Sequence, residues 1–257
     1  MYNEGRISCC IDMMFAYTDF YSRFEAVKNC GINAVEFWKW SDKDIDRVSE
    51  LSKKNGMTIS VFNLDSRDKK LSYDLSRGII NAGRKEEFVK ALEESMPVYH
   101  KLSARAMIVL IGENGEYSEQ NSYQCLKAAR PILEKENINL IIEPLNNIDR
   151  KGYSMPYAKP VFKLLRRINS PHIKMLYDIY HQNMMKDFSV TDIKNNIDII
   201  GHFHVADTNG RHEPGTGNVD FGNILKEISS LDYKGYVGLE YRATKRDEKT
   251  LDFLKEE

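Results

Sequence analysis

An unbroken alternation of short apolar segments with longer amphipathic ones runs through all 257 residues. The apolar segments predict strands at residues 7–11, 34–37, 58–62, 106–111, 139–143, 173–178, 199–205 and 238–241. The amphipathic segments predict helices at residues 17–29, from 41 or 42 to 54, 85–101, 120–135, 158–168, 190–196, 221–229 and 248–255. Residues 63–82 form a longer connection, of a length that is usually functional. Alternating strands and helices imply a parallel sheet. Eight such units without a linker predict one (β/α)₈ TIM barrel domain over residues 1–257.

The charge balance argues against nucleic acid as a partner. The formal net charge is -1 and the isoelectric point is about 6.6, so the basic excess that neutralises phosphates is missing. The first residues, MYNEGRIS, lack the apolar core of a secretory signal. No stretch approaches the roughly 18 apolar residues of a membrane span. We therefore expect a cytoplasmic protein with a small-molecule substrate and no membrane partner; a homo-oligomer is compatible with the sequence.

Four polar residues stand at the ends of predicted strands: Glu143, Asp178, His204 and Glu240. Successive members are separated by 35, 26 and 36 residues. A barrel of about 250 residues has roughly 31 residues per unit, so these positions recur at about the same height around it. They fall at the carboxyl ends of the strands, where the active sites of such barrels are built.

This residue set predicts a metal site. Three converging carboxylates would repel one another and raise their own pKa values, unless a cation neutralises them. Three oxygen ligands and one imidazole suit Mn²⁺, Mg²⁺ or Co²⁺ better than a closed structural zinc site. Each residue alone has an ordinary alternative: Glu143 and Asp178 as helix caps, His204 as a hydrogen-bonded core histidine, Glu240 as an ion-paired rim residue. Because all four residues recur at about the same height around the barrel, we favour a shared site for one divalent cation over these separate roles.

Three further residues are candidates for substrate binding. His181 follows Asp178 closely, and Arg211 lies in the loop after His204, where its fork could pair with a carboxylate or with two hydroxyls. Asn63 ends the third strand and could donate to substrate, although a turn role explains it equally well. His202 lies two residues before His204 on the same predicted strand, so both side chains point to the same face of the sheet. We expect His202 to pack one layer lower in the barrel.

The chain resembles the hydroxypyruvate isomerase family of the xylose-isomerase-like barrels. The resemblance is carried, in order, by FEAVKNCGINAVEF, the VFN strand end, GRKEEF, IIEPLN, YDIYH, IGHFHVADTNGRHEPGTGNVDF and GLEY. It implies metal ligation by Glu143, Asp178 and Glu240, with Glu143 and Glu240 also handling protons. The implied reaction interconverts hydroxypyruvate and tartronate semialdehyde through an enediolate.

One position departs from this pattern. Relatives of bacterial hydroxypyruvate isomerase often carry glutamine where this chain has His204, and a histidine there is similar to the ketose 3-epimerases of the same superfamily. Returning the proton to the neighbouring carbon isomerises the substrate, whereas returning it to the other face of the same carbon epimerises it. Epimerisation, or isomerisation of another sugar or keto acid, is therefore the alternative.

Two remote alternatives come from other classes of protein. Apurinic-site endonucleases share this barrel but use a multi-zinc site rich in histidine, and this chain has only 6 histidines and no basic excess. A non-catalytic sugar-binding module would more readily have lost one of the proton-handling glutamates, yet both Glu143 and Glu240 are present.

Overall fold

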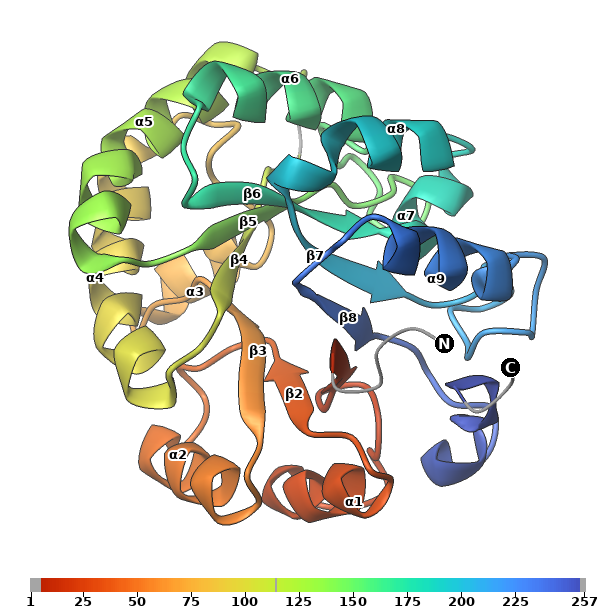
Figure 1. Ribbon diagram of the computed structural model, residues 1–257. Helices are drawn as coiled ribbons and strands as arrows, with labels where there is room; N and C mark the ends of the chain where they lie inside the picture. Colours follow the sequence, from red (N-terminus) through yellow and green to blue (C-terminus); the bar gives the residue numbers. More distant parts are fainter. Residues whose placement is uncertain (1–5, 114, 255–257) are drawn as a thin grey trace.

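The computed structural model describes residues 6–113 and 115–254, and its eight strands form a closed parallel barrel (Figure 1). The strands are β1 (Ile7–Cys10), β2 (Ala34–Phe37), β3 (Thr58–Asn63), β4 (Ala106–Leu110), β5 (Leu140–Glu143), β6 (Ile173–Asp178), β7 (Ile200–Val205) and β8 (Tyr236–Leu239). Each strand pairs with the next along the chain, and β8 pairs back onto β1. The predicted TIM barrel is confirmed.

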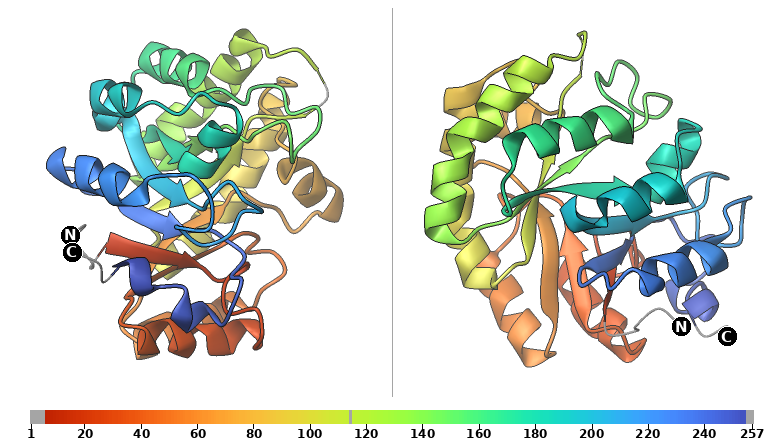
Figure 2. Two further views of the ribbon diagram at one scale, coloured as in Figure 1. Left: turned by 90° about the vertical axis from the view of Figure 1, so that its right-hand side faces the viewer. Right: turned by 45° about the horizontal axis from the view of Figure 1, so that its top comes forward.

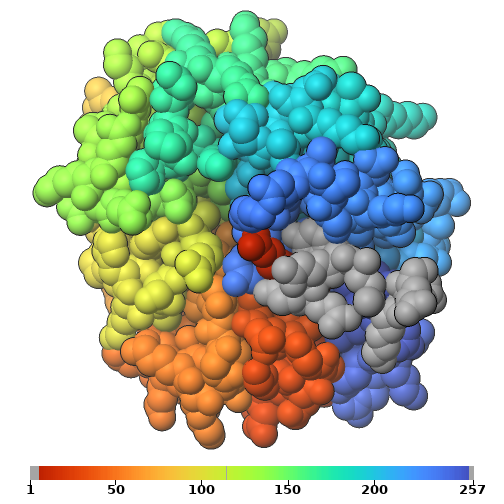
Figure 3. Space-filling model, in the orientation of Figure 1, coloured from red at the N-terminus to blue at the C-terminus, as the bar shows by residue number. Residues whose placement is uncertain are grey.

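Helices surround the barrel and cover its outer face, as the views in Figures 1 and 2 agree. The α-helices are α1 (Arg23–Asn29), α2 (Ile45–Lys54), α3 (Lys69–Leu75), α4 (Lys85–Leu102), α5 (Glu119–Glu136), α6 (Ala158–Ile168), α7 (Ile179–Met184), α8 (Val190–Asn196) and α9 (Phe221–Ser230). In the space-filling view, the coloured segments follow one another around the molecule in sequence order (Figure 3).

The strands are buried on both faces, which explains their nearly continuous apolar sequences. All five residues of β4, AMIVL, are buried. Apolar side chains on the outer face of the sheet pack under the helices. Inside the barrel, one layer is polar and contains Ser8, Glu36, Ser60 and His202, all buried. This polar layer lies beneath the residues predicted to form the site.

Several predicted elements differ from the structure. The connection at residues 63–82 contains helix α3, which begins where the Asp68 side chain accepts hydrogen bonds from the amides of Lys70 and Leu71. Helix α2 begins at Ile45 with Asp44 as its cap, rather than Ser41 or Asp42. The helix predicted at 17–29 is a 3₁₀ turn, Phe20–Ser22, followed by α1.

The last predicted helix, at 248–255, is wrong for the described residues. Two 3₁₀ turns stand there, Asp247–Lys249 and Asp252–Leu254, and residue 255 lies outside the described part of the chain. Thr250 is buried and its hydroxyl lies 2.8 Å from the hydroxyl of Tyr241. This contact draws the segment inward and interrupts a continuous helix. Helix α7, directly after β6, was not predicted.

Among the helices that the structure describes, none combines the length and the apolar character that crossing a bilayer requires.

Candidate active site

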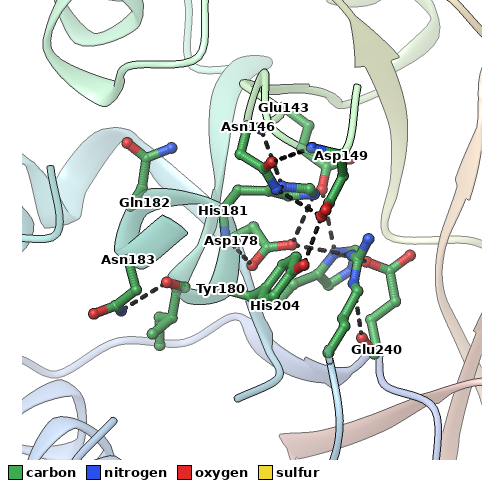
Figure 4. Close-up of polar contacts among 12 residues, drawn as sticks. Glu143, Asn146, Asp149, Asp178, Tyr180, His181, Gln182, Asn183, His204 and Glu240 are labelled. Carbon is green, nitrogen blue, oxygen red and sulfur yellow. Dashed lines mark hydrogen bonds and ion pairs between the residues drawn. The ribbon is translucent and has the colours of Figure 1, made fainter. Parts of the chain in front are cut away.

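Glu143, Asp178, His204 and Glu240 meet at the carboxyl end of the barrel (Figure 4). Glu143 and Asp178 are the last residues of β5 and β6, His204 lies near the end of β7, and Glu240 follows β8 directly. One potential ligand atom from each residue lies within 4.8 Å of the others. The structure therefore brings all four sequence-predicted residues together, and all four are buried.

Two of the converging atoms are polar, buried and without a hydrogen-bond partner. They are Oε1 of Glu143 and Nδ1 of His204. Nδ1 of His204 lies 3.5 Å from this Glu143 oxygen and 3.1 Å from Oε2 of Glu240. Buried polar atoms are nearly always satisfied in folded proteins, so unsatisfied atoms that point at one another need an explanation. A divalent cation bound between them satisfies both, and the donor set fits one.

The two glutamates of the site have opposite electrostatic surroundings. Burial raises the pKa of Glu143 to about 7. Burial acts in the same direction on Glu240, but the charges of Arg211 and His204 outweigh it and lower the pKa of Glu240 well below its usual value. Near neutral pH, the metal-free chain thus places an ionised carboxylate beside one that is readily protonated. Carboxyl pairs separated in this way are suited to acid–base chemistry.

Arg211 reaches the cluster from the loop after β7. Its Nη2 forms an ion pair with Oε2 of Glu240 and lies 3.3 Å from Oδ2 of Asp178. Its guanidinium group is 4.9 Å from the centre of the Tyr180 ring, a cation–π distance. Arg211 therefore touches two of the four convergent residues, as its predicted place at the mouth of the barrel required.

The loop that carries Arg211 is organised around one buried carboxylate. Asp207 accepts hydrogen bonds from the backbone amides of Thr208, Gly215, Gly217 and Val219, at 2.8 to 3.4 Å. A Cβ added at Gly217 would lie 2.3 Å from Oδ1 of Asp207, so only glycine fits there. The motif GRHEPGTGNVDF is thus a folded platform, and it holds Arg211 in a left-handed conformation with φ of 57°.

His181 is buried and approaches the same Asp178 oxygen as Arg211 does. Its Nδ1 accepts a hydrogen bond from the backbone amide of Asn146 at 3.1 Å, which leaves the proton on Nε2. Nε2 lies 3.4 Å from Oδ2 of Asp178 and has no hydrogen-bond partner. Burial lowers the pKa of His181 to about 4, so the ring is neutral near pH 7. A neutral N–H donor faces the cluster.

The site opens into a cavity of about 680 Å³ whose wall includes Glu143, His181, Arg211 and Glu240. Asn63 lines this cavity, and its buried Oδ1 lacks a hydrogen-bond partner. No contact between Asn63 and the four convergent residues is recorded in the described structure. Another cavity, of about 740 Å³, lies at the amino-terminal end of the barrel. None of the four convergent residues lines it.

Glu36 was missed by the sequence analysis. Its Oε2 lies 3.0 Å from Nε2 of His202, and its Oε1 lies 2.8 Å from Nε2 of His204. His202 packs below His204 as predicted, but its hydrogen bond with a carboxylate was not foreseen. The signal was available: in the predicted strand AVEF, an acidic residue stands between apolar neighbours. A buried acid in a barrel strand requires partners.

Trp38 and Lys39, directly after β2, also line the cavity and were missed. The indole N–H of Trp38 donates to Oε1 of Glu240 at 2.9 Å, while 40% of the residue remains exposed. Lys39 Nζ donates to Oγ of Ser72 at 3.2 Å, and it forms no ion pair with a described residue. The sequence signal that could have identified them is an aromatic residue followed by a lysine at the end of a predicted barrel strand.

Comparison with protein families identifies a match over most of the chain. The model described as "Xylose isomerase-like TIM barrel" matches residues 24–257. Hydroxypyruvate isomerase of Escherichia coli K12 is 32% identical, over 92% of this chain and 93% of that protein. A putative hydroxypyruvate isomerase of Danio rerio is 26% identical, over 96% and 94%. A 2-oxo-tetronate isomerase of Cupriavidus necator is 24% identical, over 97% of each.

Solved structures share the fold. A structure titled AP endonuclease, family 2, from Brucella melitensis superposes with a TM-score of 0.90 at 24% identity, covering 98% of each chain. The IolI protein, solved with a bound zinc atom, has a TM-score of 0.75 at 13% identity, covering 97% of this chain and 95% of that one. At these identities the likeness supports the barrel fold and no more.

Proposed function

Because the chain belongs to the hydroxypyruvate isomerase family of the xylose isomerase-like TIM barrels, we propose that it is a metal-dependent isomerase of a small hydroxy-carbonyl acid. The favoured reaction interconverts hydroxypyruvate and tartronate semialdehyde. It moves a proton between adjacent carbons, and the sp² carbon changes place with the hydroxyl-bearing carbon.

The observation that carries this proposal is the convergence of Glu143, Asp178, His204 and Glu240 at the mouth of a closed barrel. Three carboxylates and one imidazole would hold a divalent ion such as Mn²⁺, Mg²⁺ or Co²⁺. The unpartnered atoms of Glu143 and His204 support this assignment. When bound, such an ion supplies a Lewis acid that acidifies a C–H bond next to a carbonyl group.

Glu143 and Glu240 are proposed to transfer the proton. They flank the same ring nitrogen of His204, so they face one small volume from two sides. One of the two glutamates can accept a proton from the substrate carbon, and the other can return one. In the reverse reaction their roles exchange. His181 can donate its Nε2 proton to a substrate oxygen without carrying charge.

The cationic wall of the cavity favours an acidic substrate. Arg211 presents a planar fork suited to a carboxylate, and Lys39 lies on the same cavity without an acidic partner among the described residues. Asn63 adds an amide at the cavity wall. A neutral sugar would leave Lys39 without a counter-charge among the described residues.

Ketose 3-epimerisation is the second candidate, and His204 is the observation that favours it. The family's hydroxypyruvate isomerases often carry glutamine at this position, whereas the ketose epimerases carry histidine. The same two glutamates serve either outcome, because only the carbon face that receives the proton differs.

One screen separates these functions. The purified protein is loaded with Mn²⁺, Mg²⁺ or Co²⁺ and incubated in D₂O with hydroxypyruvate, with 2-oxo-tetronate and with free ketoses. NMR then follows product formation and deuterium uptake. We expect the highest kcat/KM for hydroxypyruvate. Faster turnover of a ketose would replace isomerisation by epimerisation, and no deuterium uptake from any substrate would contradict proton transfer.

A further inference from the structure

We propose that Glu36 is a positioning residue that orients the imidazole of His204, so that Nδ1 rather than Nε2 faces the cation site. This inference deepens the proposed function and rests on its metal site.

The His204 ring lies between two groups of carboxylates. On the cavity side, Nδ1 is 3.1 Å from Glu240 and 3.5 Å from Glu143. On the opposite side, Nε2 is 2.8 Å from Oε1 of Glu36. The residue is 2% exposed. The two nitrogens therefore have distinct neighbours: one faces the predicted ligands, and the other faces a carboxylate of the polar layer beneath.

The position of the single N–H proton gives each nitrogen of the His204 imidazole a distinct role. A neutral imidazole has one N–H and one lone pair, and a metal ligand must present the lone pair. A proton on Nε2 directed at Glu36 leaves the lone pair on Nδ1. Metal-binding histidines commonly donate their other N–H to a carboxylate in this way. Nε2 lies 2.8 Å from Oε1 of Glu36 without meeting hydrogen-bond geometry, so a small rotation of the ring would complete this bond.

The Glu36 carboxylate is itself held in place. Its Oε2 accepts a hydrogen bond from Ser60 at 3.0 Å and lies 3.0 Å from Nε2 of His202. The Ser60 hydroxyl, on β3, in turn lies 2.6 Å from the hydroxyl of Ser8 on β1. A Cβ at Gly238 would lie 2.5 Å from Oε1 of Glu36, so glycine leaves the space that this oxygen fills. Four strands thus fix one carboxylate beneath His204.

Glu36, His202 and His204 also lie close enough to hold a cation themselves. However, Nε2 of His202 and Oε2 of Glu36 are hydrogen-bonded to each other, and the same oxygen accepts from Ser60. Coordination through Nε2 of His202 would break its hydrogen bond with Glu36. The existing pairing favours a positioning role, with one cation per chain.

The wild-type protein provides the first test. Histidine ¹⁵N NMR is recorded during titration with Zn²⁺, used as a diamagnetic probe, and His204→Gln assigns the His204 signals. We expect saturation at one zinc per chain, with the metal-induced shift on Nδ1 and the proton on Nε2. Zinc on Nε2, or a second zinc that shifts His202, would overturn the proposed role of Glu36 but leave the proposed metal site standing. No zinc-dependent shift on any histidine would contradict the proposed metal site as well.

Variants provide the second test. Glu36→Gln should weaken zinc binding about 10- to 100-fold, as loss of such supporting partners does, and should mix the two tautomers of His204. His202→Gln is the matched control, because it keeps Glu36 beside His204; its loss should stay below about 10-fold. In a His204→Gln background, Glu36→Gln should add little. If Glu36→Gln weakens zinc binding just as strongly in that background, Glu36 acts on packing and not through His204. If the Glu36→Gln variant does not fold, the zinc titration of the wild-type protein remains the test of the proposal.

Discussion

The indole N–H of Trp38 donates a 2.9 Å hydrogen bond to Oε1 of Glu240, across the join between the first and last quarters of the barrel. The carboxylate is thus held by Trp38, which the strand-end pattern did not include, together with His204 and Arg211. Hydrogen bonds to a charged group contribute about 1.5–3 kcal/mol. We therefore expect this contact to affect turnover.

Trp38→Phe should lower kcat about 10-fold, because the ring remains while the donor to Glu240 is lost. Steady-state kinetics on the metal-loaded variant measure this effect. Trp40→Phe is the matched control: its indole N–H donates to Oγ of the buried Ser95, away from the four convergent residues. That variant should lower the Tm and leave kcat unchanged. Equal kcat losses in the two variants would remove the special role of Trp38.

Glu143→Gln and Glu240→Gln should each reduce turnover by about 10²–10⁴-fold, the usual cost of losing a general acid or base. Metal content is measured beside the rate, since both residues also belong to the predicted ligand set. Glu119→Gln, which alters an ion-paired glutamate on α5, controls for loss of one carboxylate. A variant with full metal content and near-normal turnover would exclude that glutamate from proton transfer.

Removal of the metal should abolish activity and lower the Tm. A ligand that binds only the folded chain, at 100 times its Kd, stabilises it by about 2.7 kcal/mol. For a chain of this size that corresponds to roughly 5–10 °C. Elemental analysis, chelator titration and thermal unfolding before and after reloading check both expectations. Full activity in a chelator-treated sample free of metal would rule the mechanism out.

Arg211→Lys should reduce kcat/KM for hydroxypyruvate about 10-fold, and far less for a neutral ketose, because a lysine cannot present the planar fork. Arg166→Lys, at a surface ion pair with Asp198, is the control. Kinetics on both substrate types are compared side by side. Equal losses on acid and ketose would mean that Arg211 does not recognise the carboxylate.

Lys39→Met should raise the KM for an acidic substrate about 10-fold while kcat changes little, since Lys39 lies on the cavity wall and touches none of the four convergent residues in the described structure. Methionine keeps most of the side-chain length. Lys163→Met, on the outer surface of α6, serves as control. An unchanged KM would leave Arg211 as the cation to test for the substrate carboxylate.

The fold and the four convergent residues were predictable because they depend on local periodicity. Strand ends repeat along the chain, and Glu143, Asp178, His204 and Glu240 each fall at one. Glu36 was not found because it lies within β2, and its partners His202 and His204 are some 166 and 168 positions away. No local pattern marks such a contact.

Local chemistry also misled at two helices. In α3 the signal was present, since Asp68 is a good cap, but only seven residues follow before the helix ends. At the chain's end, EKTLDFL has helical composition, and the buried contact between Thr250 and Tyr241 overrides it. A tertiary contact decided the second case, and a single sequence does not display it.

The pairing of β8 with β1 gives the barrel a seam, and the site is assembled across it. Glu240 follows β8 directly, whereas Glu36 and Trp38 come from the first strands of the barrel. The four predicted ligands come from β5 to β8, on one side of this seam, and two of them, Glu240 and His204, contact residues from the other side. Because Trp38 and Glu36 contact Glu240 and His204 from across the seam, a bound cation would oppose the opening of this seam. Metal supply would then govern how often the finished barrel opens at this seam.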